Sequence, residues 1–181
     1  CMVSCSKDDD DKQPDSPIVG TWESTQYEFS AVDENGKTLT LEEAIYQDMK
    51  RDFEEDGYEI TDERIRATAA EYAADIVDST DPIKLVFNAD GTLKSSVKTT
   101  GGKWVDEAPG TYKLEGNNLT ITNKEDGETN TIKANVLSLT DTELKFRINS
   151  NELESMGVSS ITEVVYISYD LTLTITFKKE K

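Results

Sequence analysis

Carboxylates dominate the side chains of this sequence that could take part in chemistry. Asp and Glu number 37 against 19 Lys and Arg, the chain contains no histidine, and the formal net charge is −18. Pairs of carboxylates hydrolyse glycosides, but acids are so abundant here that the sequence singles out no pair. Without histidine, Ser-His-Asp, Cys-His and His-rich zinc sites are excluded. We therefore predict no catalytic residue and do not expect an enzyme.

The same charge pattern bears on metals, cofactors and partners. Residues 8–11 are four consecutive Asp, without the spaced ligands and turn glycine of an EF-hand loop. Asp33, Asn35 and Gly36 fit only the first part of such a loop, since no bidentate acid follows at the required spacing. A glycine loop that cradles phosphate is also missing. We expect no metal and no cofactor, and the acidity argues against nucleic acid and against electrostatic docking on anionic lipid.

The first 17 residues differ in character from the rest. Cys1 and Cys5 are the only cysteines, so the folded domain is expected to have neither a disulfide nor a nucleophilic thiol. Because the chain begins with Cys1 rather than Met, we expect that the front of a signal peptide precedes it. Residues 6–17 are polar, contain two prolines and predict a flexible acidic tether.

Residues 2–5, Met-Val-Ser-Cys, resemble a bacterial lipobox, in which the cysteine receives diacylglycerol. The acidic run that follows resembles the start of surface lipoproteins of the Bacteroidetes. This resemblance implies lipidation of Cys5 and a lipid-anchored position on the bacterial outer membrane, exposed at the cell surface. The alternatives are a tag-derived, enterokinase-like Asp-Asp-Asp-Asp-Lys segment or an unmodified acidic tail.

Alternation of apolar and polar residues organises the rest of the chain. In residues 161–177 the odd positions are mostly apolar and the even positions mostly Thr, Ser or Asp, which predicts a strand with one buried face. We expect either one strand with a bend near residues 168–170 or two strands joined by a three-residue loop. In residues 18–30 the apolar phase changes between Trp22 and Tyr27, which predicts a bulge or a strong bend.

Residues 40–76 carry the helical pattern of the chain. Thr40 followed by Glu43 is a capping box, and Thr61 precedes two acids at the start of a second helix. Gly57 separates the two helices and Pro82 prevents continuation. The predicted apolar stripes are Leu41, Ala44, Ile45, Met49 and Phe53, then Ile65, Ala69, Tyr72, Ala73 and Ile76. We predict an α-helical hairpin inserted after the first strand, over residues 40–78 approximately.

From residue 83 onward, short alternating segments separated by turn residues predict a succession of antiparallel strands. Tight connections between them favour an up-and-down antiparallel β-barrel of about eight strands, because closure removes exposed sheet edges. We therefore expect one mostly β domain over residues 18–181. Many side chains expected inside it are large, among them Phe87 and Phe146, which indicates a narrow apolar cavity or a filled core.

Several short motifs in this order resemble the lipocalins and the lipocalin-like lipoprotein domains of the Bacteroidetes. The motifs are Gly-Thr-Trp at residues 20–22, Phe-Asn-Ala-Asp-Gly-Thr at 87–92, Gly-Thr-Tyr-Lys-Leu at 110–114 and Thr-Phe-Lys-Lys at 176–179. The resemblance implies a lipocalin-like barrel, with Gly20 and Trp22 as its structural signature. Classical lipocalins stack an Arg from near the chain end on the motif Trp, whereas only Lys178 or Lys179 stands there in this chain.

Two hypotheses for function follow. In the first, the protein is a monomeric envelope lipoprotein without enzymatic activity that binds a small apolar or amphipathic molecule. Its ligand would contact Trp104, Met49, Phe53 and Tyr72 at the barrel mouth, with the helical hairpin as a cap or a lid. Trp104 could instead be a rim residue packed on the helices, whereas Trp22 is expected to plug the closed end. In the second hypothesis the barrel is filled, and its acidic face or its helices bind a protein or a glycan.

Overall fold

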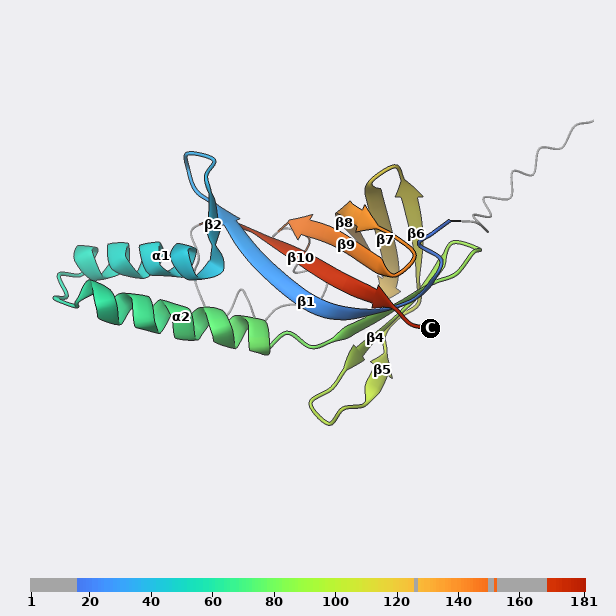
Figure 1. Ribbon diagram of the computed structural model, residues 1–181, viewed down its shortest axis with the longest axis horizontal. Coiled ribbons are helices and arrows are strands. Elements are labelled where there is room, and N and C mark those ends of the chain that lie inside the picture. The colour runs from blue at the N-terminus through green and yellow to red at the C-terminus, as the bar shows by residue number, and fades with distance from the viewer. Residues whose placement is uncertain (1–15, 126, 150–151, 153–168) are drawn as a thin grey trace, which may run out of the picture.

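Ten strands and two helices make up the computed structural model, which describes residues 16–125, 127–149, 152 and 169–181. Figure 1 shows the strands wrapped around one another and the two helices projecting to one side. In chain order the elements are β1 Gly20–Val32, β2 Thr38–Thr40, α1 Leu41–Glu55, α2 Asp62–Asp78, β3 Ile83–Phe87, β4 Thr92–Lys98, β5 Trp104–Asp106, β6 Gly110–Glu115, β7 Asn118–Glu125, β8 Glu128–Leu139, β9 Glu143–Asn149 and β10 Asp170–Lys179.

Eight of these strands form a closed antiparallel barrel. Each pairs with the next in the order β1, β3, β4, β6, β7, β8, β9, β10, and β10 returns to pair with β1. The short strands β2 and β5 pair with β1 and β4 and lie outside this cycle. The predicted up-and-down barrel of about eight strands is confirmed. Because the cycle closes, its strands expose no free edge of the kind that promotes aggregation.

The register of β1 against β10 shifts between Ser24 and Gln26, so Thr25 forms a bulge. Before the bulge the buried side chains of β1 stand at even positions, such as Trp22; after it they stand at odd positions, such as Phe29. A bulged residue reverses the inward phase because side chains alternate along a strand. The bulge predicted from the change of phase is therefore confirmed, and it lets the 13-residue strand β1 follow the curved barrel wall.

Strand β10 buries its odd positions as predicted. Leu173, Ile175 and Phe177 are fully buried, and Phe177 stacks on Phe146 of β9 with ring centroids 5.1 Å apart. Thr174 and Thr176, at the even positions expected on the face opposite the core, are also buried, which the alternation did not predict. β10 begins at Asp170, within the predicted bend or three-residue loop near residues 168–170. Residue 168 and the preceding half of the pattern lie outside the described residues.

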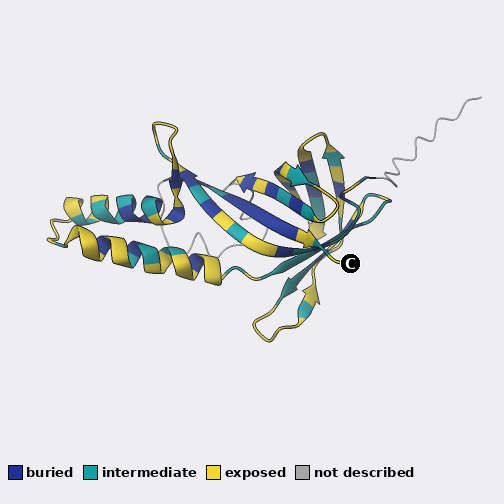
Figure 2. Ribbon diagram, in the orientation of Figure 1, coloured by how far each residue is buried: buried dark blue, intermediate teal, exposed yellow. Residues whose placement is uncertain are grey.

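The helical hairpin begins and ends as the capping pattern predicts. The hydroxyls of Thr40 and Thr61 accept hydrogen bonds from the backbone N–H groups of Glu43 and Arg64 at the two helix starts. After α1, Gly57 adopts φ +75°, and the N–H of Tyr58 donates to the carbonyl of Phe53, which forms a Schellman motif. Figure 2 shows that the hairpin is buried mainly where α1 meets β1 and β2. No helix in the described part of the chain has the length and apolarity needed to cross a membrane.

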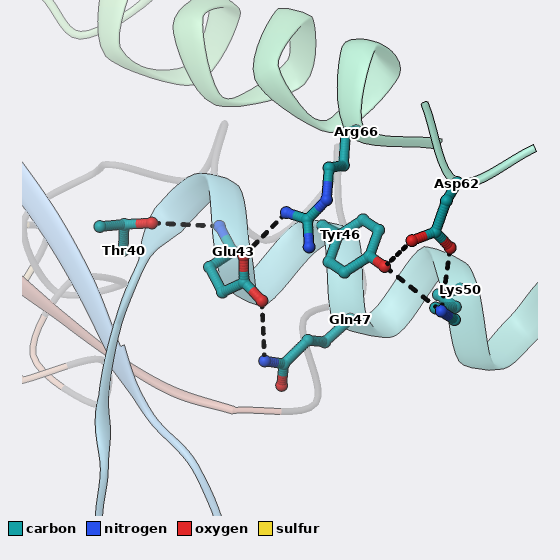
Figure 3. A network of polar contacts seen from close by, with 7 residues as sticks. All are labelled: Thr40, Glu43, Tyr46, Gln47, Lys50, Asp62 and Arg66. Carbon is teal, nitrogen blue, oxygen red and sulfur yellow. Dashed lines mark hydrogen bonds and ion pairs between the residues drawn. The ribbon is translucent and has the colours of Figure 1, made fainter. Parts of the chain in front are cut away.

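Polar contacts hold α1 and α2 together around Tyr46 (Figure 3). The Arg66 guanidinium lies 3.7 Å from the centre of the Tyr46 ring and donates to the Glu43 carboxylate at 3.1 Å. The Tyr46 hydroxyl donates to Asp62 at 2.8 Å, and Lys50 donates to the same carboxylate at 2.9 Å. Hydrogen bonding from Lys50, followed by that from Tyr46, lowers the pKa of Asp62. Each exposed ion pair contributes at most about 1 kcal/mol, so the hairpin is aligned by many weak contacts.

Candidate functional site

The two ends of the barrel are built differently. At the end that we call the plugged end lie the start of β1, the end of β10 and the turns 88–91, 116–117 and 140–142. Trp22 is fully buried there, and its indole N–H donates to the Ile18 carbonyl at 2.7 Å. A buried indole needs such a partner because an unsatisfied N–H costs about 1–3 kcal/mol. The side chain thus plugs this end, as predicted.

Gly20 and Lys179 complete the plug. The Lys179 ammonium lies 5.0 Å from the centre of the Trp22 ring and donates to the Pro17 carbonyl at 3.3 Å. Lys179 therefore occupies the place that an Arg has in classical lipocalins, and Lys178 is exposed. Gly20 has φ +138°, and a Cβ at this position would lie 2.5 Å from Lys179 Cε. Glycine is needed here both for the backbone conformation and for the approach of the lysine.

The motifs at 87–92 and 110–114 meet at the same end. The Phe87 and Tyr112 rings contact edge to face with centroids 4.8 Å apart, and the Tyr112 hydroxyl donates to the Asn88 carbonyl at 2.8 Å. Burial raises the pKa of Tyr112. In the turn between β3 and β4, the Asp90 carboxylate accepts from the hydroxyl of Thr92 at 2.6 Å and from its N–H at 2.9 Å. These motif residues build a turn and a plug, and none of those named here lines the cavity described next.

A cavity of about 370 Å³ occupies the other half of the barrel. That volume lies within the range of small-molecule sites, about 300–1,000 Å³. Apolar side chains from both sides of the barrel form most of its wall: Ile83, Leu85, Leu93, Val97, Ala108, Ile121, Ile132, Phe146, Ile148 and Phe177. Because buried apolar surface contributes about 25 cal/mol per Å², such a wall favours the alkyl or ring part of a ligand.

Polar residues gather where this cavity reaches the surface, at the end that we call the mouth. They are Ser95, Asp106, Glu107, Asn123 and Asn130. Glu107 and Asp106 are exposed, whereas Ser95 is buried. The Ser95 hydroxyl donates to the Glu107 carboxylate at 3.3 Å, and the Glu107 N–H donates to the Ser95 carbonyl at 2.9 Å. These bonds hold Glu107, which follows β5, against the inward-facing Ser95. The Asp106 carboxylate, at the end of β5, accepts instead from Ser96 on the outward phase of β4.

Asn123 lies opposite Gly110 on the neighbouring strand β6. A Cβ on Gly110 would collide with Asn123 Oδ1 and would lie 2.8 Å from the Thr122 carbonyl oxygen, so the glycine makes room for the amide. Asn123 Oδ1 is buried and has no hydrogen-bond partner within the described part of the chain. A buried acceptor without a donor is costly, and this one belongs to a side chain that lines the cavity.

Trp104, predicted at the mouth, does not line the cavity. Its strand β5 pairs with β4 so that Trp104 stands opposite Lys98, and the ammonium groups of Lys84 and Lys98 lie 4.5 Å and 5.5 Å from its ring centre. The even positions of β4 and β3 face outward, because the odd positions Leu85 and Leu93 point into the barrel. Trp104 thus lies on the outer face of the sheet, beside two lysines.

The three predicted contacts on the helices also lie away from the cavity lining. Met49 and Phe53 pack partly buried against the core, and Phe53 contacts Tyr58 edge to face at 6.1 Å. Tyr72 is 41% exposed, although the helical stripe placed it on the buried face of α2. The reason is that the hairpin projects beyond the barrel, which leaves much of α2 in solvent (Figure 2). Met49, Phe53 and Tyr72 are on the helices, whereas Trp104 is on β5. A ligand-binding role for these four residues remains a prediction.

The sequence analysis did not predict the polar residues of the mouth as site residues. For three of them, the alternation pattern contains an indication. Ser95, Asn123 and Asn130 each continue the inward phase of a strand whose other inward residues are apolar. A polar residue in the apolar phase near a strand end marks the place where a barrel interior meets water. Asp106 and Glu107 gave no such signal. Cys5, the predicted lipidation site, lies outside the described residues. Among the residues described, no three potential metal ligands come together.

Comparison with known proteins adds a family to this geometry. Residues 18–146 match a family model described as a lipocalin-like domain. Among curated proteins, no significant match was found. Among solved structures, the chain is similar to a tryptophan-to-alanine mutant of the vaccine antigen transferrin-binding protein B from Haemophilus parasuis Hp5, with a TM-score of 0.34 and 9% identity. The match covers 90% of this chain and 27% of that one.

Proposed function

Since the chain belongs to the family of lipocalin-like domains, we propose that it is a non-enzymatic binding protein that holds a small apolar or amphipathic molecule inside its barrel. A barrel of this kind suggests ligand binding in general. The observation that carries the proposal for this chain is the cavity of about 370 Å³ with its apolar wall. The apolar part of the ligand would lie against Ile121, Ile132 and Phe146, and its polar part would lie at the mouth.

The size of the cavity separates this proposal from a filled barrel that acts only through its surface. Eight-stranded barrels have an interior that side chains either fill or leave open for one small ligand. In this barrel the large side chains gather at the plugged end, where Trp22, Phe87 and Tyr112 are buried. The small or polar residues Ser95 and Ala108 stand at the mouth. This uneven distribution of volume supports ligand binding over a surface function.

Titration with the fluorescent apolar amine N-phenyl-1-naphthylamine tests the proposal on the purified protein. Its fluorescence should rise in a saturable manner, with one site per chain, and an excess of a neutral alkanol should reverse the rise. Native mass spectrometry after mild extraction from the producing bacterium would give the mass of any co-purified ligand. A signal that never saturates, together with a ligand-free spectrum, would count against the proposal.

Anchoring of the chain to the bacterial outer membrane is a second part of this proposal. The support is the lipobox-like run Met-Val-Ser-Cys at residues 2–5 and the acidic run after it. Acyl chains on Cys5 would anchor the protein with about 0.8 kcal/mol per buried CH₂, while the tether carries the barrel at the cell surface. Denaturing mass spectrometry of the protein from its native bacterium should find Cys5 as the N-terminus with an acyl mass. An unmodified N-terminal peptide that still carries residues 1–4 would contradict it.

A further inference from the structure

The mouth of the cavity carries negative charge and hydrogen-bond acceptors. Asp106 and Glu107 are among the residues that line it: the Glu107 carboxylate bonds to the inward-facing Ser95, and the Asp106 carboxylate bonds to Ser96 beside it. Asn123 adds a buried amide oxygen that has no partner among the described residues. The described residues that line this cavity include no lysine or arginine. A ligand lying in the apolar part would therefore place its polar end among groups that accept hydrogen bonds and attract cations.

Resting on the proposed function, we propose that the site selects cationic amphiphiles with a primary ammonium head over amphiphiles of equal length with a carboxylate head. The ammonium group offers three N–H donors, which suit the Glu107 carboxylate and the Asn123 oxygen, and the charge of Asp106 next to Glu107 adds attraction at longer range. A carboxylate head would lie near these like charges and would find no lysine or arginine among the described residues of the lining. Its desolvation on entering the mouth would then be uncompensated.

Lys84 of β3 and Lys98 of β4 are engaged on the outer face of the sheet. Lys84 and Lys98 lie over the outward-facing Trp104 ring, and Lys84 also pairs with Glu180 at 2.6 Å. Neither lysine lines the cavity. The hydrogen bonds of the two acids come from neutral serines, at 2.8 Å from Ser96 to Asp106 and at 3.3 Å from Ser95 to Glu107. The charge of both acids is thus not neutralised by these partners and remains available to a ligand.

Three ten-carbon probes compare head groups while the alkyl chain stays constant: decylamine, decanol and decanoate. Their affinities for the full chain are measured at neutral pH by displacement of N-phenyl-1-naphthylamine and by calorimetry. We expect decylamine to bind about tenfold more tightly than decanoate, with decanol between them, since unlike charges attract and like charges repel over a few ångströms at a partly solvated site. The ratio should shrink as salt is added, because exposed carboxylates are screened.

Two double variants locate the preference. In Asp106→Asn with Glu107→Gln, both serine hydroxyls keep an acceptor, so the fold should persist, and the amine-to-carboxylate ratio should fall to about 2. In Asp141→Asn with Glu143→Gln, which removes the same charge at the plugged end, the ratio should not change. Circular dichroism of each variant verifies its fold.

The outcomes separate the two levels of the proposal. If decanol and decanoate bind equally well and decylamine does not exceed them, the head-group selection is wrong while ligand binding stands. Should the preference persist in the mouth variant, or fall equally in the plugged-end variant, the assignment to Asp106 and Glu107 is wrong. If no probe binds at all, the proposed function fails together with the selection.

Discussion

The plugged end and the mouth of this barrel share the same strands but use them differently. At the plugged end, Trp22 is fully buried and bonded to Ile18, and the motif residues Phe87 and Tyr112 pack edge to face. At the mouth, the inward positions of those strands change to Ser95 and Asn123, and a cavity of about 370 Å³ is left. The comparison teaches that most motif residues of this chain maintain the fold, whereas its candidate site consists, apart from Phe177 of the last motif, of residues outside the motifs.

Truncation of the plug should give the largest effect. Trp22→Ala removes the largest fully buried side chain and leaves the Ile18 carbonyl without its donor. We expect a loss of about 3–5 kcal/mol in the free energy of unfolding, measured by denaturant titration. The matched control is Trp104→Ala, which removes a half-buried ring next to Lys84 and Lys98 and should cost only about 1 kcal/mol. Equal losses for the two tryptophans would contradict the distinction between plug and outer face.

A smaller effect is expected at Gly20. Gly20→Ala forces a Cβ onto a backbone with φ +138° and displaces Lys179 from the Trp22 ring. The expected loss of stability is about 1–3 kcal/mol. At Gly36, φ is +79° and no atom would contact the new Cβ, so Gly36→Ala reports the backbone cost alone. Combining Gly20→Ala with Lys179→Ala measures the share due to the clash; if the double variant shows no coupling between the two changes, the lysine does not matter.

Blocking the mouth should affect binding more than stability. Ala108 is half-buried in the segment between β5 and β6 and lines the cavity. Ala108→Trp should fill part of the entrance and weaken N-phenyl-1-naphthylamine binding about tenfold or more, while stability changes by about 0.5 kcal/mol. The control introduces the same large side chain at an exposed position of β5, as Val105→Trp. A buried position such as Ala31 could not serve, because a tryptophan there would disturb the core. Unchanged binding in Ala108→Trp would place the ligand outside the barrel.

The smallest effect is a pH dependence at the plugged end. The hydroxyl of Thr92, followed by its N–H, hydrogen-bonds to Asp90 and lowers the pKa of this carboxyl below its ordinary value of 3.8. Since the folded pKa lies below the unfolded one, the ionised carboxylate stabilises the fold above the unfolded pKa, and the contribution is lost as the pH falls through the folded pKa. Asp90→Asn should thus lower Tm slightly at neutral pH, and the difference from the unchanged protein should close as the pH falls through the lowered pKa of Asp90. A difference in Tm that widens in acid would contradict a lowered pKa of Asp90 in the folded protein.

Local patterns in the sequence were sufficient for the barrel and the helical hairpin. Alternation identified β3, β4 and β6 through β9, the change of phase in β1 predicted its bulge, and the caps at Thr40 and Thr61 are present. These features depend on residues close together in the chain, which explains why they could be read in advance. The spatial position of Trp104 depends on the register of β5 against β4, which the glycines before it do not determine.

The candidate site required the three-dimensional structure for a similar reason. Glu107 stands at the mouth because backbone and side-chain bonds to Ser95 hold this residue after β5, and Asp106 is bonded to Ser96 beside it. Such a crossing between strands leaves no periodic signal. The exposure of Tyr72 has a related origin, because the stripe of α2 is covered by α1 but only partly by the barrel. Periodicity tells which face of an element is apolar, and it does not tell how much of that face a neighbour reaches.

Intermolecular nuclear Overhauser effects between decylamine and selectively labelled isoleucine δ1 methyl groups test the central claim most directly. Four isoleucines line the cavity, at positions 83, 121, 132 and 148. Ile18 lies at the plugged end, and Ile45, Ile65 and Ile76 lie on the helices. The account predicts that the alkyl protons of the ligand give effects to the four cavity methyl groups and to none of those of Ile18, Ile45, Ile65 and Ile76. Effects confined to the helical isoleucines would contradict a ligand site inside the barrel.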